Sequence, residues 1–370
     1  MNAKPSIDKK AICNGLLDLF KQHRRWVFFF GTGTSCDVDP SFGMAALQEQ
    51  LGKELGEVPE WRRVDEALRA GKTLEQALDG TDAGLSPEAK LKFRQVTGDY
   101  VASVDRRYRD ELLSGSRKWV GTNLLLTLLG RLPPANPRLS VITSNYDMLI
   151  EYACSARRIR WTTGFVGELT RTWNWDAAQD SLLQSRVTRN GTRGMTELNR
   201  VPRVELFKVH GSINRFMRGG EQIECDLWSE AAPSDFERDL AIPGGLKYQQ
   251  HAESNADTTY RARQAIEGAQ GYLMIGYGFN DRHLHDRIVE QVRQYDRPLI
   301  VMTQKLDVAA IKKLRQTGDK VWILLAATAP DGHCDPSRTK VYMPGCQKPV
   351  DLNNEQLWKC DVFTECILGG

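Results

Sequence analysis

Six short runs of apolar residues, spread along the chain, set the strongest limit on its fold. Each is rich in β-branched and aromatic residues and is almost uninterrupted by polar side chains. The runs are Trp26–Phe30, Leu139–Thr143, Glu205–Val209, Tyr272–Gly276, Leu299–Thr303 and Val321–Leu325. Such runs are typical of strands buried on both faces. Helical patterns alternate with them, as at Thr122–Leu129, so the sequence predicts a doubly wound, mostly parallel α/β sheet covered by helices.

The spacing of these runs is uneven and indicates how the chain is organised. More than one hundred residues separate the first two runs, and most of them show helical patterns. A Trp-containing stretch, 160–203, lacks periodicity, which favours loops or short strands over a site. We therefore expect the first part of an α/β domain, a helical insertion subdomain, the remainder of the α/β domain and a C-terminal tail of unknown role. These parts span residues 1–50, 51–120, 121–330 and 331–370.

Composition narrows the class of protein. Fifty Lys and Arg residues against 47 Asp and Glu residues give a net charge of +3, which does not directly indicate nucleic-acid binding or a membrane surface. No apolar run is long enough to span a membrane, and the N-terminus does not resemble a signal peptide. The eight cysteines form no CxxC pair, which argues against a structural zinc module. We expect a cytoplasmic protein whose thiols are reduced.

The first apolar run leads directly into a glycine-containing loop, Gly31–Gly43. Glycines allow backbone N–H groups to approach a diphosphate, and a following helix N-terminus adds a favourable dipole. The loop lacks both a third glycine at Rossmann spacing and the Gly-Lys-Ser/Thr of a P-loop. A tight turn between a strand and a helix explains the same residues, so this motif alone leaves two interpretations open.

Polar side chains also follow the second and third runs. The second ends at Thr143, with Asn145 and Asp147 just beyond it, at the strand edge where α/β sheets bind ligands. Asp147 alone is explained equally well as a helix cap, whereas Asn145 is not, because one cap residue is enough. The third leads into His210 and Gly211, which makes His210 a candidate general base, although a lone histidine is more often structural.

The fourth run ends in a second glycine-containing segment, Gly276–His285. Gly276 and Gly278 again permit close backbone approach, and Asn280 or Asp281 suits either a helix cap or a ribose hydroxyl. His283 and His285 are two residues apart, so on a helix they diverge. No other ligands at metal-binding spacing surround them, and we expect no metal site.

Taken in order, these four strand ends resemble the sirtuin-like NAD-binding family. Gly31–Ser35 is similar to the family's Gly-Ala-Gly-x-Ser loop, with Thr32 in place of alanine. Thr143–Asp147 matches its Thr-x-Asn-x-Asp strand end, and His210–Gly211 matches its His-Gly catalytic turn. Gly276–Asp281 resembles the Gly-Tyr-Ser-Phe-x-Asp form of bacterial members. The resemblance implies a Rossmann-like fold of the sirtuin type, with NAD as the substrate.

The resemblance also implies roles for individual residues. Catalysis would fall to His210, Asn145 and Asp147, with His210 as the general base and backbone amides of the first loop holding the diphosphate. The residues expected to bind NAD are Gly31, Thr32, Gly33, Thr34, Ser35, Thr143, Gly276, Tyr277, Gly278, Asn280 and Asp281.

The chain departs from protein-deacylating sirtuins in one informative respect. Those enzymes carry a four-cysteine zinc module after the catalytic histidine, where this chain has only Cys225. The departure fits the bacterial anti-phage branch, whose members hydrolyse NAD to nicotinamide and ADP-ribose. An NAD hydrolase must be regulated, and we expect that control to come from a homo-oligomer or from a separate sensor or ATPase partner. The alternatives are a protein deacylase or ADP-ribosyl transferase, and a non-catalytic subunit that senses NAD or ADP-ribose.

Overall fold

The computed structural model describes residues 8–79, 85–190, 193–242, 255–279, 282–329 and 333–369. Its centre is a nine-stranded sheet in the order β16-β15-β14-β13-β12-β1-β2-β8-β3. The seven strands from β14 to β3 are parallel, and β15 and β16 run antiparallel at one edge. The predicted doubly wound, mostly parallel α/β sheet is therefore confirmed. The strands are β1 (Trp26–Phe30), β2 (Arg138–Thr143), β3 (Arg160–Thr162), β8 (Arg203–Lys208), β12 (Gly271–Ile275), β13 (Leu299–Thr303), β14 (Val321–Thr328), β15 (Cys334–Tyr342) and β16 (Val350–Leu352).

Helices bury both faces of this sheet, which explains why its strands are apolar throughout. Along β1, Phe28 and Phe30 belong to one core cluster, whereas Val27 and Phe29 belong to the other. The first cluster lies under α1 (Lys9–Gln22), α7 (Thr122–Leu129), α8 (Leu149–Ala156) and the C-terminal helices α14 (Cys360–Phe363) and η4 (Thr364–Leu368). The second lies under α11 (Ala256–Gly268), α12 (Arg282–Tyr295) and α13 (Val308–Arg315).

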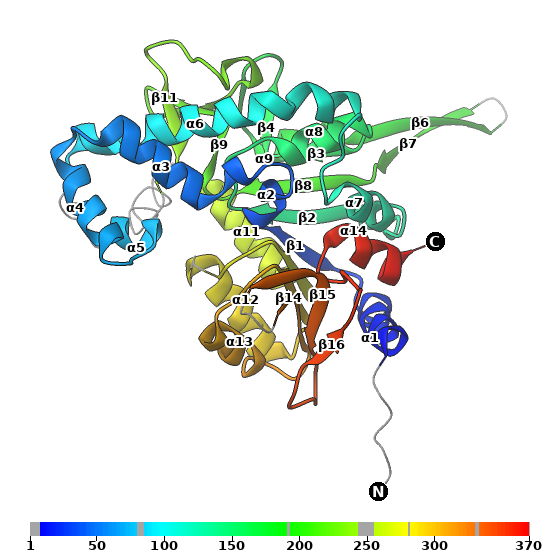
Figure 1. Ribbon diagram of the computed structural model, residues 1–370. Coiled ribbons are helices and arrows are strands. Elements are labelled where there is room, and N and C mark those ends of the chain that lie inside the picture. The colour runs from blue at the N-terminus through cyan, green and yellow to red at the C-terminus, as the bar shows by residue number, and fades with distance from the viewer. Residues whose placement is uncertain are drawn as a thin grey trace, which may run out of the picture.

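A group of helices between β1 and β2 forms a core of its own. It comprises α3 (Met44–Leu55), α4 (Pro59–Arg69), α5 (Leu74–Asp79) and α6 (Pro87–Ser114), after the short α2 (Gly33–Cys36) and η1 (Pro40–Phe42). Leu51, Trp61 and Phe93 are buried together there. In Figure 1, α3, α4 and α5 stand to one side of the main sheet, and α6 runs back over it. These helices cover most of the predicted insertion, 51–120, although α3 begins before it.

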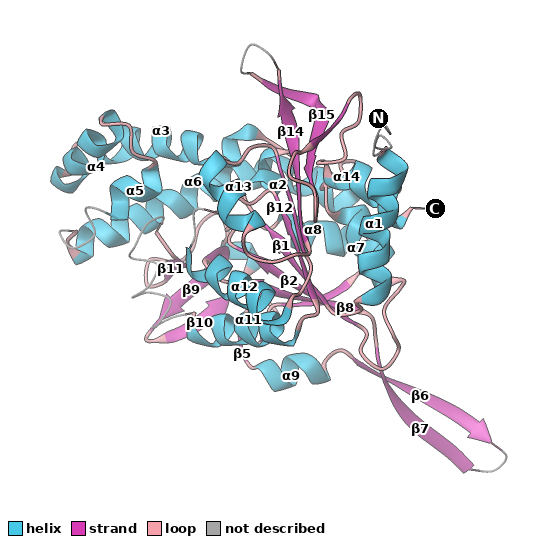
Figure 2. Cartoon of the chain, turned by 90° about the horizontal axis from the view of Figure 1, so that it is seen from below, coloured by secondary structure: helices cyan, strands magenta, loops and turns pink. Residues whose placement is uncertain are grey.

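The Trp-containing stretch and the segment after β8 build a second, five-stranded sheet. Its order is β11-β9-β10-β5-β4. A two-stranded hairpin of β6 and β7 projects away from the rest of the molecule (Figure 2). The elements are β4 (Phe165–Gly167), β5 (Arg171–Trp173), α9 (Trp175–Asp180), β6 (Leu183–Asn190), β7 (Arg193–Arg200), β9 (Gly211–Arg218), β10 (Glu221–Glu224), η3 (Asp226–Trp228) and β11 (Glu237–Leu240).

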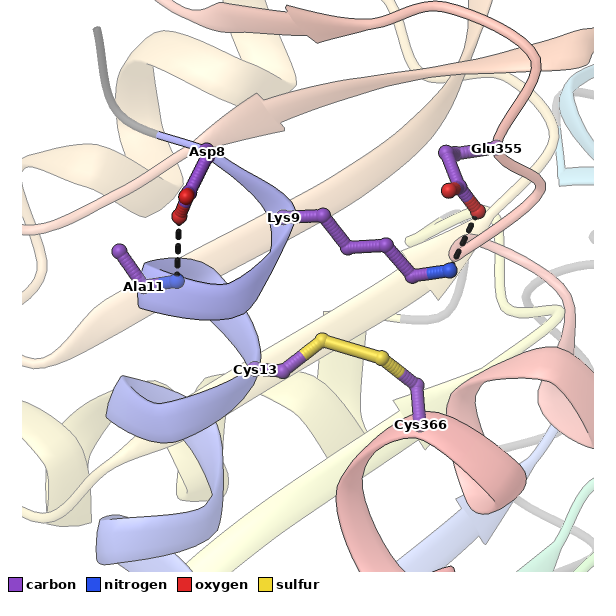
Figure 3. Close-up of a disulfide and its surroundings, with 6 residues drawn as sticks. All are labelled: Asp8, Lys9, Ala11, Cys13, Glu355 and Cys366. Carbon is purple, nitrogen blue, oxygen red and sulfur yellow. Dashed lines mark hydrogen bonds and ion pairs between the residues drawn. A yellow bond between two sulfur atoms is a disulfide. The ribbon is translucent and has the colours of Figure 1, made fainter.

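The C-terminal segment, whose role the sequence left open, completes the main sheet and returns to the N-terminus. After β15 and β16, the chain packs η4 against α1, where a disulfide joins Cys13 to Cys366 (Figure 3). Lys9 Nζ lies 2.6 Å from a carboxylate oxygen of Glu355 beside it. The expectation that all eight cysteines are reduced is thus wrong for this pair. Their separation by 353 residues offered no sequence signal, because only the fold brings the two Cα atoms to 6.4 Å.

No helix among the described residues combines the length and the apolar character that crossing a membrane requires.

We expect the disulfide to stabilise the fold. Reduction, or Cys13→Ser, should lower the free energy of unfolding by about 2–4 kcal/mol, because the bond restricts the unfolded chain. Urea denaturation with and without a reductant measures this. Thiol titration of the denatured protein should give six free cysteines before reduction.

Cys334→Ser is the matched control, because Cys334 is an exposed free cysteine. It should leave the unfolding midpoint unchanged. A reductant that fails to move the wild-type midpoint would contradict the stabilising role of the Cys13–Cys366 bond.

Candidate functional site

A cavity of about 230 Å³ lies where β1, β2, β8 and β12 end. The carboxyl ends of parallel strands meet at this edge, which is where open α/β sheets bind ligands. Residues that follow β2, β8 and β12 form one wall, and helices α3, α5 and α6 supply the other. The lining residues are Thr32, Phe42, Met44, Leu47, Glu75, Tyr100, Val101, Ser144, Asn145, Tyr146, Asp147, His210, Gly276, Tyr277 and Gly278.

The glycine-containing loops after β1 and β12 pack directly against each other. A Cβ atom on Gly31 would lie 2.6 Å from the carbonyl oxygen of Gly276, and one on Gly33 would lie 2.8 Å from the Cα of Gly276. Gly276 itself has a φ of +63°, which favours glycine. The glycines of the two loops therefore do permit a close backbone approach, as the sequence suggested. In the structure the two loops approach each other.

This packing uses the amides that were expected to hold a diphosphate. The N–H groups of Gly31 and Gly33 donate to the carbonyls of Ile275 and Gly276, and that of Thr34 donates to the carbonyl of Gly31. Of the first-loop residues predicted to bind NAD, Gly31 to Ser35, only Thr32 lines the cavity. The glycines of the first loop are thus explained by the turn and its contact with Gly276.

Asn145 is held in a fixed orientation at the cavity. Its Nδ2 donates to Ser35 Oγ at 2.8 Å and to the carbonyl of Gly31 at 3.1 Å, which ties β2 to the first loop. Thr143 supports it from behind, because its hydroxyl accepts from the Asn145 N–H and donates to the carbonyl of Phe30. Asn145 is only 7% exposed, and its buried Oδ1 has no hydrogen-bond partner among the described residues. A buried amide oxygen in this state is suited to a ligand donor.

Asp147 lies beside Asn145 and is bound on both carboxylate oxygens. Ser35 Oγ donates to Oδ2 at 2.7 Å, and the Leu149 N–H donates to Oδ1 at 3.3 Å at the start of α8. The second bond lies just before α8, whose N-cap residue is Met148 and has no side-chain capping bond, so Asp147 is not the cap itself. The Asp147 side chain also lines the cavity. Burial raises the pKa of the Asp147 carboxyl above its usual range, and the nearby Lys208 ammonium and the Ser35 hydroxyl oppose that shift.

His210 enters the same cavity from the end of β8. It is buried, and its carbonyl accepts from the Ala241 N–H at 2.9 Å, which fixes the turn. Gly211 follows with a φ of +83°, and a Cβ atom there would lie 2.0 Å from the carbonyl oxygen of Asp239. Backbone geometry therefore requires the glycine at 211, independently of any chemistry of the His210 imidazole.

A layer of buried acids lies where α6 packs against α8. Asp105 of α6 accepts from the Met148 N–H at 2.8 Å and from the Tyr152 hydroxyl at 2.6 Å. Burial raises the pKa of Asp105 to about 7, against the hydrogen bonds that favour its ionised form. Burial also raises the pKa of Glu151, whose carboxylate accepts from Lys208.

The structure brings together seven of the predicted site residues and places others behind them. Those that line the cavity are Thr32, Asn145, Asp147, His210, Gly276, Tyr277 and Gly278, whereas Gly31, Gly33, Thr34, Ser35 and Thr143 support it. Asn280 and Asp281 lie outside the described residues. In the part of the chain that the structure describes, no three His, Cys, Asp or Glu side chains form a group that could hold a metal.

The wall of the cavity that the helices supply was not predicted from the sequence. Phe42, Met44 and Leu47 approach it from η1 and α3, Glu75 from α5, and Tyr100 from α6. No motif marks these residues, because apolar side chains at helical spacing look like ordinary core. Only the folded structure shows that the helical insertion contributes to the site.

The comparisons with known proteins agree with the position of this site. Residues 139–318 match the family model described as SIR2-like domain, a range that includes β2, β8 and β12 and the residues that follow them. The first glycine loop lies outside that range. A search of curated proteins gave no significant match.

Solved structures of Sir2 proteins show a distant likeness. A structure that addresses the mechanism and regulation of Sir2 enzymes is 11% identical, with a TM-score of 0.39, and the alignment covers 85% of this chain and 90% of that one. A Sir2 homologue in complex with NAD is 15% identical, with a TM-score of 0.38 and coverage of 78% and 81%. The fold assignment therefore rests on the sheet topology of the chain itself.

The raised pKa of Asp105 predicts a pH dependence of stability. Between about pH 4 and pH 7 the folded protein keeps a proton on Asp105 that the unfolded chain releases, so the free energy of unfolding falls as pH rises through this window. Asp105→Asn should remove this contribution. Urea denaturation of both proteins across the window should show the variant gaining stability relative to wild type as pH rises.

Asp110→Asn provides a control on the same helix, because Asp110 is exposed. The difference in free energy of unfolding between Asp110→Asn and wild type should not change with pH as it does for Asp105→Asn. If the difference in free energy of unfolding between wild type and Asp105→Asn stayed constant between about pH 4 and pH 7, the assignment of this titration to Asp105 would be wrong.

Proposed function

We propose that the chain is an enzyme that hydrolyses the nicotinamide–ribose bond of NAD, giving nicotinamide and ADP-ribose. The observation that carries the proposal is the meeting of Asn145, Asp147 and His210 in one cavity at the carboxyl edge of the sheet. The match of residues 139–318 to the SIR2-like model supports it, because that range supplies all three residues.

In the proposed reaction the bond between the ribose C1′ and the nicotinamide nitrogen breaks, and nicotinamide leaves with the bonding electrons. A water oxygen forms the new bond to C1′ and passes its proton to His210, directly or through a ribose hydroxyl. Asn145 and Asp147 orient the ribose and the water, and the Asp147 carboxylate offsets the positive charge that develops on the ribose. Orientation and electrostatic stabilisation thus supply most of the rate enhancement.

The size of the cavity bears on how the rest of NAD binds. Pockets for whole ligands commonly measure roughly 300–1,000 Å³, so a cavity of about 230 Å³ suits one end of the dinucleotide. We assign the nicotinamide riboside end to the Asn145–His210 wall. The remainder would extend along Thr32 and the segment Gly276–Gly278, and Met44, Leu47 and Glu75 would cover it from the helical insertion.

The biological role follows from the resemblance to the anti-phage branch. We infer that the protein acts in the cytoplasm as the effector of such a system, where loss of NAD would halt an infected cell. Such an activity requires control, which a homo-oligomer or a separate sensor or ATPase partner would provide. Light scattering at several protein concentrations tests the oligomer.

His210→Ala should abolish NAD cleavage while the fold is retained. Removing a general base of this kind costs about 10²–10⁴-fold in rate, and Asn145→Ala should lower turnover as well, because Asn145 orients the ribose. Purified protein is incubated with NAD, alone and with the product of its neighbouring gene, and nicotinamide and ADP-ribose are followed by chromatography. Circular dichroism checks that each variant is folded.

His23→Ala is the control, since His23 precedes β1 at the opposite edge of the sheet. It should retain full turnover. Undiminished turnover by folded His210→Ala would refute the mechanism. Formation of O-acyl-ADP-ribose only when an acylated peptide is added would favour the deacylase, and NAD or ADP-ribose binding without turnover would favour the sensing subunit.

A further inference from the structure

We propose that Lys208 is a positioning residue that holds the Tyr146–Asp147 backbone, and with it the Asp147 carboxylate, in the orientation the site requires. The inference deepens the proposed function, on which it rests for its kinetic readout. It concerns a lysine that sequence analysis placed in the third apolar run and to which it assigned no role.

Lys208 is the last residue of β8 and is only 1% exposed. Its Nζ donates to the carbonyl of Asp147 at 2.5 Å and to Glu151 Oε1 at 2.8 Å, and it lies 3.5 Å from the carbonyl of Tyr146. An ammonium has three donors. Two of these three contacts are with the backbone of the segment that carries Asp147.

The contacts with backbone carbonyls connect β8 to the segment between β2 and α8. The Tyr146 carbonyl also accepts from the Ile213 N–H at 3.0 Å, whereas the Asp147 carbonyl accepts from Lys208 Nζ. The side chains of this segment face the cavity at Asn145, Tyr146 and Asp147. Fixing the carbonyls on either side of the Asp147 N–H and Cα restricts the backbone torsions that direct its side chain. Lys208 therefore acts on the site through Asp147 and does not line the cavity itself.

The acids around Lys208 explain why a cation is buried there. Asp147, Glu151 and Asp105 are all buried in this layer, and Lys208 is the cation that contacts Glu151 directly. Arg171 of β5 also interacts electrostatically with Glu151, and Cys36 interacts electrostatically with Asp147. Removing the ammonium would leave the Glu151 carboxylate buried beside Asp147 without its ion-pair partner. An unpaired buried charge lowers the stability of the fold.

Lys208→Met tests the inference, because methionine has a similar length and no donor. Arg203→Met is the matched control: Arg203 begins the same strand, is 2% exposed and pairs with Glu205 at 3.2 Å, but it lies at the opposite edge of the sheet. Both variants lose a buried cation. We expect kcat for NAD cleavage to fall by about 10²-fold in Lys208→Met, as small misplacements of a reacting group do, with KM little changed, and kcat to change less than about twofold in Arg203→Met.

A double-mutant cycle separates positioning from general destabilisation. If Lys208 acts through the Asp147 carboxylate, Lys208→Met should cost little further rate in the Asp147→Asn background. Multiplicative losses in the double variant would overturn the proposal, as would an unchanged kcat in folded Lys208→Met. An equal loss of kcat in Arg203→Met would overturn it too.

Hydrogen exchange keeps this test distinct from the test of the hydrolase. Peptides spanning residues 144–150 should exchange faster in Lys208→Met than in Arg203→Met. Faster exchange together with an inactive wild-type protein would reject the hydrolase and leave the holding role of Lys208 standing. Unchanged exchange would reject that role whether or not the protein cleaves NAD.

Discussion

The contact between the backbones of Gly31, Gly33 and Gly276 is the constraint on which the arrangement of the site depends. Hydrogen bonds from the first loop to the carbonyls of Ile275 and Gly276 continue the β1–β12 pairing beyond the last residues of the two strands. The turn after β1 is thereby fixed, and with it the position of Ser35. Because Ser35 bonds both Asn145 and Asp147, a backbone contact between glycines contributes to the orientation of both candidate site residues.

The same network separates residues that support the site from residues that face it. The Thr143 hydroxyl donates to Phe30, the Gly31 carbonyl accepts from Asn145, and the Ser35 hydroxyl accepts from Asn145 and donates to Asp147, so these groups are already satisfied within the protein. The Asn145 Oδ1 atom, by contrast, is buried and unsatisfied among the described residues. A protein gains nothing in stability from such an atom, which is why we interpret it as a group that meets a ligand.

Much of the sheet could be predicted from sequence, and much of the site could not. The apolar runs located β1 and β13 to the residue, because strands buried on both faces carry an uninterrupted pattern. Asn145, Asp147 and His210 could be assigned to one edge because parallel strands share their carboxyl ends. The first glycines left two interpretations open, because a motif shows that the backbone comes close to a neighbour but not which neighbour; in the structure Gly31 and Gly33 contact the backbone of Gly276. The Cys13–Cys366 bond and the helical wall at Met44 and Leu47 depend on contacts between distant segments that no local pattern encodes.

The Cys13–Cys366 disulfide closes residues 13–366 into a covalent ring. A single cut by a protease within that ring opens it without releasing a fragment, so the two pieces stay attached until the bond is reduced.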